Sequence, residues 1–197
     1  MQEKTFFSSR ASQTIALLVI FIFGIGIRLY DLTDLPLDFH STRQLLSALK
    51  ARGMYYATLT NAEIDTDIRV FAIQQWQARA SVEPEFFERI VAFTYQFTGE
   101  QVWIARIYSS VFWMIGAIFL FLLARKLANI DGAITSTAIY VFLPYAIIAS
   151  RSFQPDPLMT MLIIIFCGQY LNGQKNRHIN LQSLLVCLVA LQSLLNL

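Results

Sequence analysis

The stretch Val102–Ala124 reads VWIARIYSSVFWMIGAIFLFLLA. It is long and apolar enough to cross a bilayer, which takes about 17–25 predominantly apolar residues. Its one charged residue is Arg106, near its beginning, and Arg125 and Lys126 follow its end. We therefore predict a membrane-spanning helix here.

The whole chain has the composition of an integral membrane protein. Of its 197 residues, 56% are hydrophobic and 14% are charged, and the mean hydropathy is +0.52. These values are too apolar for an ordinary soluble domain, so lipid must surround much of the chain. We expect an all-α bundle of about five spans, at Thr14–Leu29, Val102–Ala124, Gly132–Ala149, Pro157–Leu171 and Leu181–Leu197.

The first apolar run has the length of a signal-peptide core, and Lys4 and Arg10 supply its basic flank. Its apolar core reaches the stretch Arg28–Asp31 without a convincing small-x-small cleavage site. We favour an uncleaved signal anchor over a removed signal peptide.

Charge placement predicts the topology of a multi-pass protein. Cytoplasmic loops carry an excess of Lys and Arg, so the N-terminus and the segments after the second and fourth spans are expected to be cytoplasmic. The long segment 30–101, here called the outer loop, and the turn 151–156 would then share the outer face, by default of a bacterial plasma membrane. The basic residues concerned are Lys4, Arg10, Arg125, Lys126, Lys175 and Arg177. The net charge of +2 is too small to indicate nucleic acid.

The outer loop is too long to be a passive connection. Asp38 and Ser41 can both cap a helix that runs toward Gly53, with Lys50 and Arg52 on its polar side. This pattern predicts an amphipathic helix lying at the membrane interface.

A second helix is predicted after Pro84, which suits a first helical turn. Aromatic and aliphatic residues recur at helical spacing from Phe86 to Phe97, and Gly99 ends the pattern. The outer loop is thus expected to form a set of interfacial helices that roof one side of the bundle.

Two acidic residues of the outer face could carry chemistry. Asp38 follows the first span, and Asp156 lies in the short turn between the third and fourth spans. One carboxylate could accept a proton from an attacking hydroxyl while the other orients a substrate or holds a cation. Arginine is well matched to phosphate, and the outer-face candidates are Arg43, Arg69, Arg106 and Arg151. No ligand cluster for a metal is visible, so a divalent cation is neither predicted nor excluded.

Each of these residues also has a structural interpretation. Asp156 followed by Pro157 is a favoured helix start, and Asp38 could be a simple cap or turn residue. Arg106 and Arg151 lie near span ends, where long cationic side chains commonly snorkel to the interface.

The order of these features resembles the N-terminal half of the GT-C membrane glycosyltransferases. Two motifs carry the likeness most specifically: Trp103-x-x-Arg106 at the head of the second span, and the turn Ser150–Leu158 with its Arg-x-x-x-Pro-Asp pattern. Within that group the chain is most similar to the bacterial branch of the protein mannosyltransferases and aminoarabinose transferases. The likeness runs from about Ile15 to Leu171.

The resemblance implies a sugar donor carried on a polyprenyl phosphate and transfer to a lipid, glycan or protein acceptor at the outer membrane face. It also implies an essential carboxylate in the first outer loop, acting as the base, and a second acidic residue after the third or fourth span. Asp156 matches the second position. Asp38 is the better candidate for the first, where the family usually has an Asp-Glu pair after a proline. That pair could instead align with His40 and Ser41, which makes His40 a possible substitute base.

The chain departs from the family in length, since relatives carry further spans. Leu197 falls inside an apolar run, so we expect a truncated bundle whose donor groove needs the remaining half of the enzyme or a partner chain. A non-catalytic membrane scaffold, with aspartates that only cap helices, is the alternative function. A transporter fits less well, because the span interiors carry essentially no ionisable residues.

Overall fold

The computed structural model of the chain describes residues 6–60, 64–79 and 84–176. All regular structure within these ranges is α-helical, which confirms the all-α part of the predicted fold class. The helices are α1 (Arg10–Leu29), α2 (Ser41–Thr58), α3 (Thr66–Gln77), α4 (Phe86–Thr98), α5 (Trp103–Leu127), α6 (Ile130–Phe142), α7 (Pro144–Ala149) and α8 (Asp156–Asn176).

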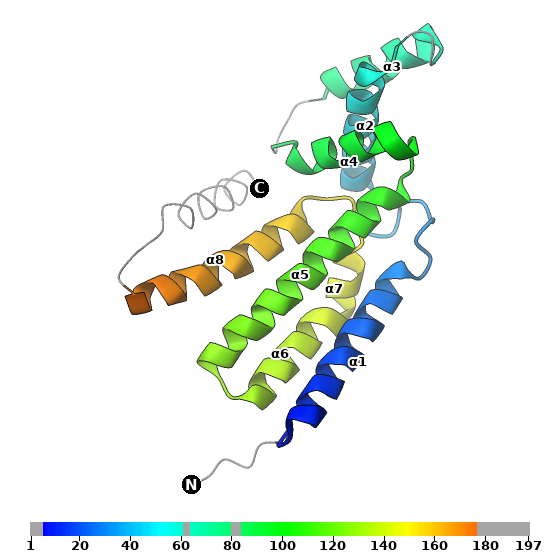
Figure 1. Cartoon of the computed structure of the whole chain (residues 1–197). Coiled ribbons are helices and arrows are strands. Elements are labelled where there is room, and N and C mark those ends of the chain that lie inside the picture. Colours follow the sequence, from blue (N-terminus) through cyan, green and yellow to red (C-terminus); the bar gives the residue numbers. More distant parts are fainter. Residues whose placement is uncertain (1–5, 61–63, 80–83, 177–197) are drawn as a thin grey trace.

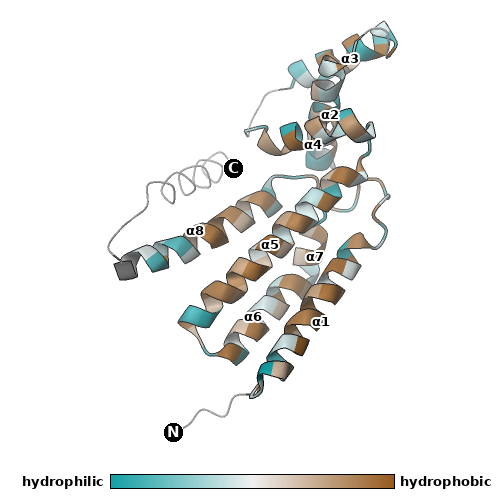
Figure 2. Cartoon of the chain, in the orientation of Figure 1, coloured by the Kyte–Doolittle hydropathy of each residue, from teal (hydrophilic) through white to brown (hydrophobic). Residues whose placement is uncertain are grey.

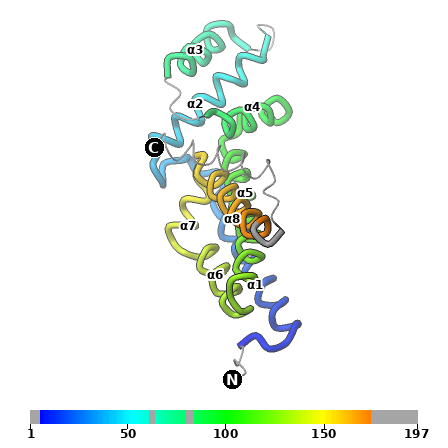
Figure 3. The backbone as a smooth tube through the Cα atoms, turned by 90° about the vertical axis from the view of Figure 1, so that its left-hand side faces the viewer, coloured from blue at the N-terminus to red at the C-terminus, as the bar shows by residue number. Residues whose placement is uncertain are grey.

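The helices form two layers (Figure 1). Helices α1, α5, α6, α7 and α8 make an elongated bundle in which α5 packs against both α6 and α8, and α1 packs against α5 and α6. Helices α2, α3 and α4, here called the cap, sit at one end of this bundle, with α2 packed between α3 and α4. The side view shows α3 as the part of the cap farthest from the bundle (Figure 3).

Two of the described helices, α1 and α5, are long and apolar enough to cross a membrane by length and composition, and α6 is a shorter apolar helix. Hydrophobic residues dominate α1 and α5 along most of their length, whereas α2 and α3 are mixed (Figure 2). Arg125 and Lys126 lie in the last turn of α5, where cations complement the helix dipole. The fifth predicted span, Leu181–Leu197, lies outside the described residues.

The third predicted span is not one helix, which corrects the expectation for Gly132–Ala149. It is divided into α6 and α7 at Leu143, whose φ of −55° and ψ of 127° are not helical. Pro144 is the cause, because a proline disfavours the helical conformation of the preceding residue and has no N–H for the helix ladder.

The orientation of α2 also differs from the prediction. Lys50, expected on the exposed side, is 4% exposed, and its Nζ lies 3.1 Å from Glu85 Oε1 in the segment before α4. Leu45 is exposed instead, at 46%. The reason is that α2 is covered by cap helices on two sides and buries a polar side against them.

The predicted helix after Pro84 is confirmed as α4, and Gly99 is its C-cap with a φ of 74°. Residues Phe87, Val91 and Tyr95 of α4 are buried. They join a hydrophobic cluster with Ala51 of α2 and Phe153 of the turn before α8. This shared core fixes the cap to the end of the bundle.

Candidate functional site

Three segments meet where the cap joins the bundle: residues 30–40 after α1, the first turn of α2, and the turn 150–155 before α8. We call this meeting point the junction. Gln154 Nε2 donates to the Phe39 carbonyl at 3.3 Å, and Ser109 Oγ of α5 donates to the Ser152 carbonyl at 2.6 Å. The prediction that the outer loop and the short turn lie at the same end of the bundle is confirmed by these contacts.

Gln44 of α2 links two of these segments. It is completely buried, and its Oε1 accepts from the Phe153 backbone N–H at 3.0 Å. Its Nε2 donates to the Phe39 carbonyl at 2.5 Å and lies 3.4 Å from Asp38 Oδ1. One amide side chain thereby satisfies backbone groups in both the segment 30–40 after α1 and the turn 150–155.

Arg106 anchors the segment 30–40, between α1 and α2, to α5. Its guanidinium donates through Nη1 to the Asp31 carbonyl at 3.2 Å and through Nη2 to the Leu35 carbonyl at 3.0 Å. The residue is 2% exposed. As it stands, Arg106 is occupied in holding the backbone before Asp38.

Arg151 reaches the same backbone from the turn. Its Nη2 donates to the carbonyls of Tyr30 and Asp31, the latter at 3.0 Å. Asp31 has a φ of 55°, in the left-handed region that Asp tolerates better than most residues. Two arginines from different elements therefore hold one sharp bend after α1.

Asp38 does not cap α2, so the cap interpretation is wrong, although the residue does lie in a bend between α1 and α2. The N-cap of α2 is His40, with a φ of 44° and no side-chain cap hydrogen bond. The Asp38 carboxylate turns toward α5 instead, with Oδ1 3.5 Å from Arg106 Nη2. Its side chain remains 45% exposed, so one side of the carboxylate is open.

Asp156 lies in the first turn of α8. Its Oδ2 is 3.7 Å from Arg43 Nη1, and the two side chains are 34% and 36% exposed respectively. Arg43 is in α2, so this ion pair links the cap to α8. The structure thus brings together Asp156 and Arg43, two residues singled out from the sequence.

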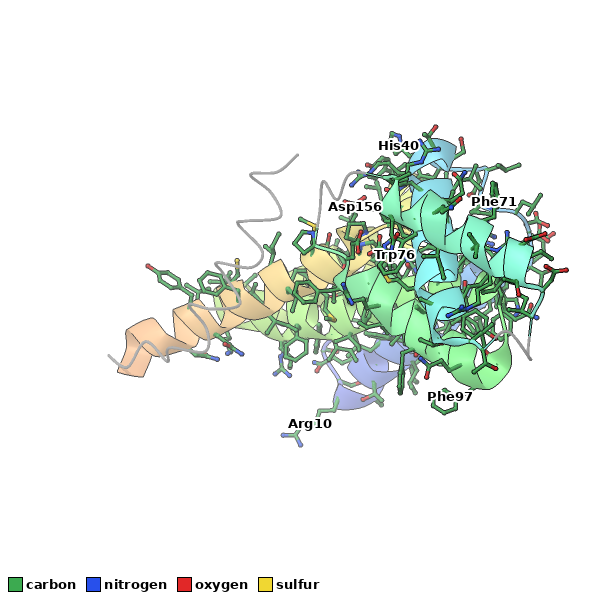
Figure 4. The ribbon with its side chains drawn as sticks, turned by 90° about the horizontal axis from the view of Figure 1, so that it is seen from above. Arg10, His40, Phe71, Trp76, Phe97 and Asp156 are labelled. Carbon is green, nitrogen blue, oxygen red and sulfur yellow. The ribbon has the colours of Figure 1, made fainter. Side chains whose placement is uncertain are left out.

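His40 is exposed, and its ring packs edge-on against Phe39 at a centroid distance of 4.5 Å. Seen from above, His40 and Asp156 lie on the same side of the cap (Figure 4). This contact of the His40 ring is aromatic, and the role of His40 as a substitute base stays a prediction.

A carboxylate pair stands at the bend itself. A side-chain hydrogen bond from the neighbouring Asp34 raises the pKa of Asp31 above its ordinary value, and the Coulombic effect of Asp34 acts in the same direction. Arg151 and Arg106 oppose this shift. The Asp31 carboxyl therefore keeps its proton to a higher pH than an isolated aspartate would.

Sequence reasoning missed Gln44 and identified Gln154 only as part of the turn. The available signal for Gln44 was its spacing with Ser47 and Ala51, three and seven residues later, since all three lie on the buried side of α2. A polar residue on such a side implies buried hydrogen-bond partners. One of those partners, the Phe153 N–H, is 109 positions away, and a local pattern does not contain it.

Three polar atoms of the junction are buried without a hydrogen-bond partner in the described structure: Arg106 Nε, Arg151 Nε and Gln154 Oε1. Buried polar atoms rarely stay unpaired in folded proteins. The junction therefore has donors and an acceptor available for a polar ligand or for solvent. Among the described residues, no three potential metal ligands gather at one point.

A separate cavity of about 260 Å³ lies between α1 and α5. Phe21, Ile25, Val111 and Ile115 are among its largely apolar lining residues. Neither Asp38 nor Asp156 lines it.

The sequence profile of the dolichyl-phosphate-mannose-protein mannosyltransferase family matches residues 83–194, more than half of the chain. The match includes Arg106, Arg151 and Asp156 but does not extend to Asp38, His40 or Arg43. No curated protein and no solved structure matches the chain. Since most of the chain fits the profile, this protein belongs to the dolichyl-phosphate-mannose-protein mannosyltransferase family of membrane glycosyltransferases.

Proposed function

We propose that this chain transfers a sugar from a polyprenyl-phosphate carrier to a hydroxyl group of a lipid, glycan or protein acceptor, and that the reaction takes place at the junction. The observation that carries this proposal is the placement of two partly exposed carboxylates, Asp38 and Asp156, each facing an arginine at the same join between cap and bundle. The family membership supports the reaction type.

The reaction we propose is a single displacement. The acceptor oxygen attacks the anomeric carbon from the side opposite the phosphate, and the bond between that carbon and the phosphate oxygen breaks. The polyprenyl phosphate leaves with the bonding electron pair, and the acceptor's hydroxyl proton passes to the Asp38 carboxylate. Attack from the opposite side inverts the configuration of the anomeric carbon. General-base assistance of this kind contributes about 10²–10⁴-fold to a rate.

We assign the remaining residues different tasks. Arg43, whose side chain is 36% exposed, is the proposed contact for the donor phosphate, because a guanidinium matches phosphate geometry. Asp156 orients Arg43 through their ion pair. Arg106 and Arg151 hold the backbone that carries Asp38. His40 is kept as the substitute base.

The sidedness of the reaction follows from charge placement. Arg10 begins α1 and Arg125 and Lys126 end α5, and both of these helix ends lie at the end of the bundle opposite the cap (Figure 1). The positive-inside rule would place that end in the cytoplasm. We accordingly place the cap and the junction on the outer face, with a bacterial plasma membrane as the working assignment.

The test uses membranes that contain the chain and a donor panel that begins with dolichyl-phosphate mannose, the donor in the family's name. The released polyprenyl phosphate is quantified for the parent chain and for Asp38→Asn, Asp156→Asn and Asp67→Asn. Asp67 is an exposed aspartate of α3 in the cap, so its variant is the matched control.

We expect Asp38→Asn to lower the turnover by about 10²–10⁴-fold while expression is retained. Asn caps a helix about as well as Asp, so loss of transfer in Asp156→Asn would indicate a need for its charge. Asp67→Asn should behave like the parent chain. Full transfer in both the Asp38 and Asp156 variants would remove this mechanism, whereas no transfer by the parent chain with any donor would favour a scaffold.

A further inference from the structure

The cavity between α1 and α5 is a groove that opens at the surface of the bundle, and we call it the α1–α5 groove. Its lining residues run from Phe21 to Leu29 in α1 and from Ile107 to Ile118 in α5. Met114, at the floor of the groove, is 8% exposed, whereas the residues at its rims are 45–49% exposed. The rim residues are Ile25 and Leu29 of α1 and Val111 and Ile118 of α5. Because the rims are exposed, a molecule beside the bundle can enter the groove.

Contacts between α1 and α6 hold the groove open. A Cβ at Gly24 of α1 would lie 2.5 Å from Val141 Cγ1, so the two helices touch at this glycine. Arg28 Nη2 donates to the Val141 carbonyl at 3.1 Å. That carbonyl is in the last turn of α6, where carbonyls lack helical partners. Helix α1 would lose these contacts if it moved toward α5, and the walls of an unfilled groove lack dispersion contacts. The groove is therefore a preformed space that favours an occupant.

The depth and length of the groove match one leaflet of a bilayer. Arg125 and Lys126, in the last turn of α5, must remain near headgroups. Counting back about 20 residues from them places the other boundary of the hydrocarbon near Ala105, just on the cap side of Ile107. At ~1.5 Å per residue, the groove extends ~16 Å from Ile107 to Ile118, against ~15 Å for half of a hydrocarbon core. The end of α1 and the beginning of α5 both lie at the cap (Figure 1), so this leaflet is the one on the cap side.

Two residues of the groove have a buried polar atom without a hydrogen-bond partner in the described part of the chain, namely Arg28 Nε and Ser110 Oγ. Arg28 is 0% and Ser110 7% exposed. The other guanidinium nitrogens are engaged, since Nη1 donates to the Gly24 carbonyl at 2.9 Å and Nη2 to Val141. Arg28 lies in the last turn of α1, at the cap-side end of the groove. An occupant that is hydrocarbon along its length and has one oxygen acceptor at that end would satisfy the unpaired Nε.

We propose that the α1–α5 groove holds one acyl chain of a glycerophospholipid from the leaflet on the cap side, and that the ester carbonyl of this chain accepts a hydrogen bond from Arg28 Nε. The bound chain fills the gap and joins α1 to α5. A polyprenyl chain fits less well, because its first oxygen belongs to the phosphate and the Nη groups that would meet a phosphate are engaged. Asp38 and Asp156 do not line the groove, so the lipid site is separate from the junction and does not rest on sugar transfer.

The experiment determines which lipid stays with the purified full chain. The chain is reconstituted in vesicles of palmitoyl-oleoyl phosphatidylethanolamine that also contain undecaprenyl phosphate, is extracted in detergent and is weighed intact by native mass spectrometry. A second set of vesicles contains the ether-linked analogue of the phospholipid, which has the same chains but no ester carbonyl. Val111→Phe narrows the groove at its α5 rim. Leu122→Phe is the matched control, because Leu122 of α5 is 47% exposed and does not line the groove.

We expect the parent chain and Leu122→Phe to retain one ester-linked phospholipid, and Val111→Phe to retain it several-fold less often. The loss of one hydrogen bond corresponds to about a fivefold change in binding, so the ether analogue should be retained about fivefold less than the ester lipid. Equal retention of the two lipids would overturn the contact assigned to Arg28.

Three other results would overturn the lipid site as a whole. They are the absence of bound lipid from the parent chain, equal retention by Val111→Phe and the parent chain, and preferential retention of undecaprenyl phosphate. Ile25→Phe narrows the groove from α1 and gives the same reading if the Val111 variant does not fold. None of these readings requires sugar transfer, so the outcome is independent of the test of function.

Discussion

Replacing Gln44 with leucine tests whether the junction depends on one buried amide. Leucine fills a similar volume but can neither donate nor accept a hydrogen bond. The Phe39 carbonyl would lose the hydrogen bond from Gln44 but would still accept one from Gln154 Nε2 at 3.3 Å. The Phe153 N–H would lose the acceptor that the structure shows for it at 3.0 Å. Leaving one buried donor unsatisfied costs about 1–3 kcal/mol, which is the destabilisation we expect for Gln44→Leu.

The contribution through Asp38 should be smaller. The distance from Gln44 Nε2 to Asp38 Oδ1 is 3.4 Å, and the side chain of Asp38 is 45% exposed. A long hydrogen bond to a partly solvated acceptor is weak. A double-mutant cycle with Asp38→Asn should therefore give a coupling energy below about 1 kcal/mol.

Two measurements address this prediction. A cost of 1–3 kcal/mol corresponds to about 5- to 150-fold faster hydrogen exchange, and the effect should centre on the Phe153 amide. In thermal unfolding of the detergent-solubilised chain, each kcal/mol should lower the midpoint by about 2–4 °C for a protein of this size. Gln74→Leu, at an exposed position of α3, is the control. If the two variants unfold together and the Phe153 amide exchanges at its original rate, then Gln44 does not hold the junction.

Two further predictions concern the packing within the cap. Burial raises the pKa of Glu88, so between its ordinary value and the raised one the folded chain keeps a proton that the unfolded chain has lost. Stability should consequently fall as pH rises through that interval, and Glu88→Gln, which can still accept from Ser47, should flatten the dependence in unfolding curves. Gly53→Ala should destabilise the chain by about 1–3 kcal/mol through overpacking, since a Cβ there would lie 2.3 Å from Trp76 Cβ. Gly26→Ala in α1 meets no atom within 4 Å and should instead gain up to about 1 kcal/mol from helix propensity; equal melting shifts for the two glycines would contradict the packing argument.

Much of the fold was predictable because its signals are local. A long apolar run with basic residues at one end predicted α5, and the helical recurrence from Phe86 to Gly99 predicted α4. Pro144 could have warned of the break between α6 and α7, because its effect on the preceding residue is purely local. The apolar composition around it outweighed that signal and led to one predicted span.

The candidate site was predictable only in part. Topology alone placed Asp38 and Asp156 on one face, since both follow spans that end on the same side. The partners of these carboxylates were not predictable: Asp38 faces Arg106, and Asp156 faces Arg43, at 3.5 and 3.7 Å respectively. The same limit applied to Lys50, whose burial depends on Glu85 and on the helices that cover α2.

By itself, the sequence determined the class of the protein: an all-helical chain with spans suited to lipid and a substantial segment between the first two of them. These properties follow from solvation, because apolar runs and the backbone groups within them have few stable arrangements in a bilayer. Only the tertiary structure decided which polar groups meet at the junction and which side of each cap helix is covered. Those choices are set by contacts between residues as far apart as Gln44 and Phe153, and a hydrogen bond between distant residues leaves no periodic trace in the sequence around either one.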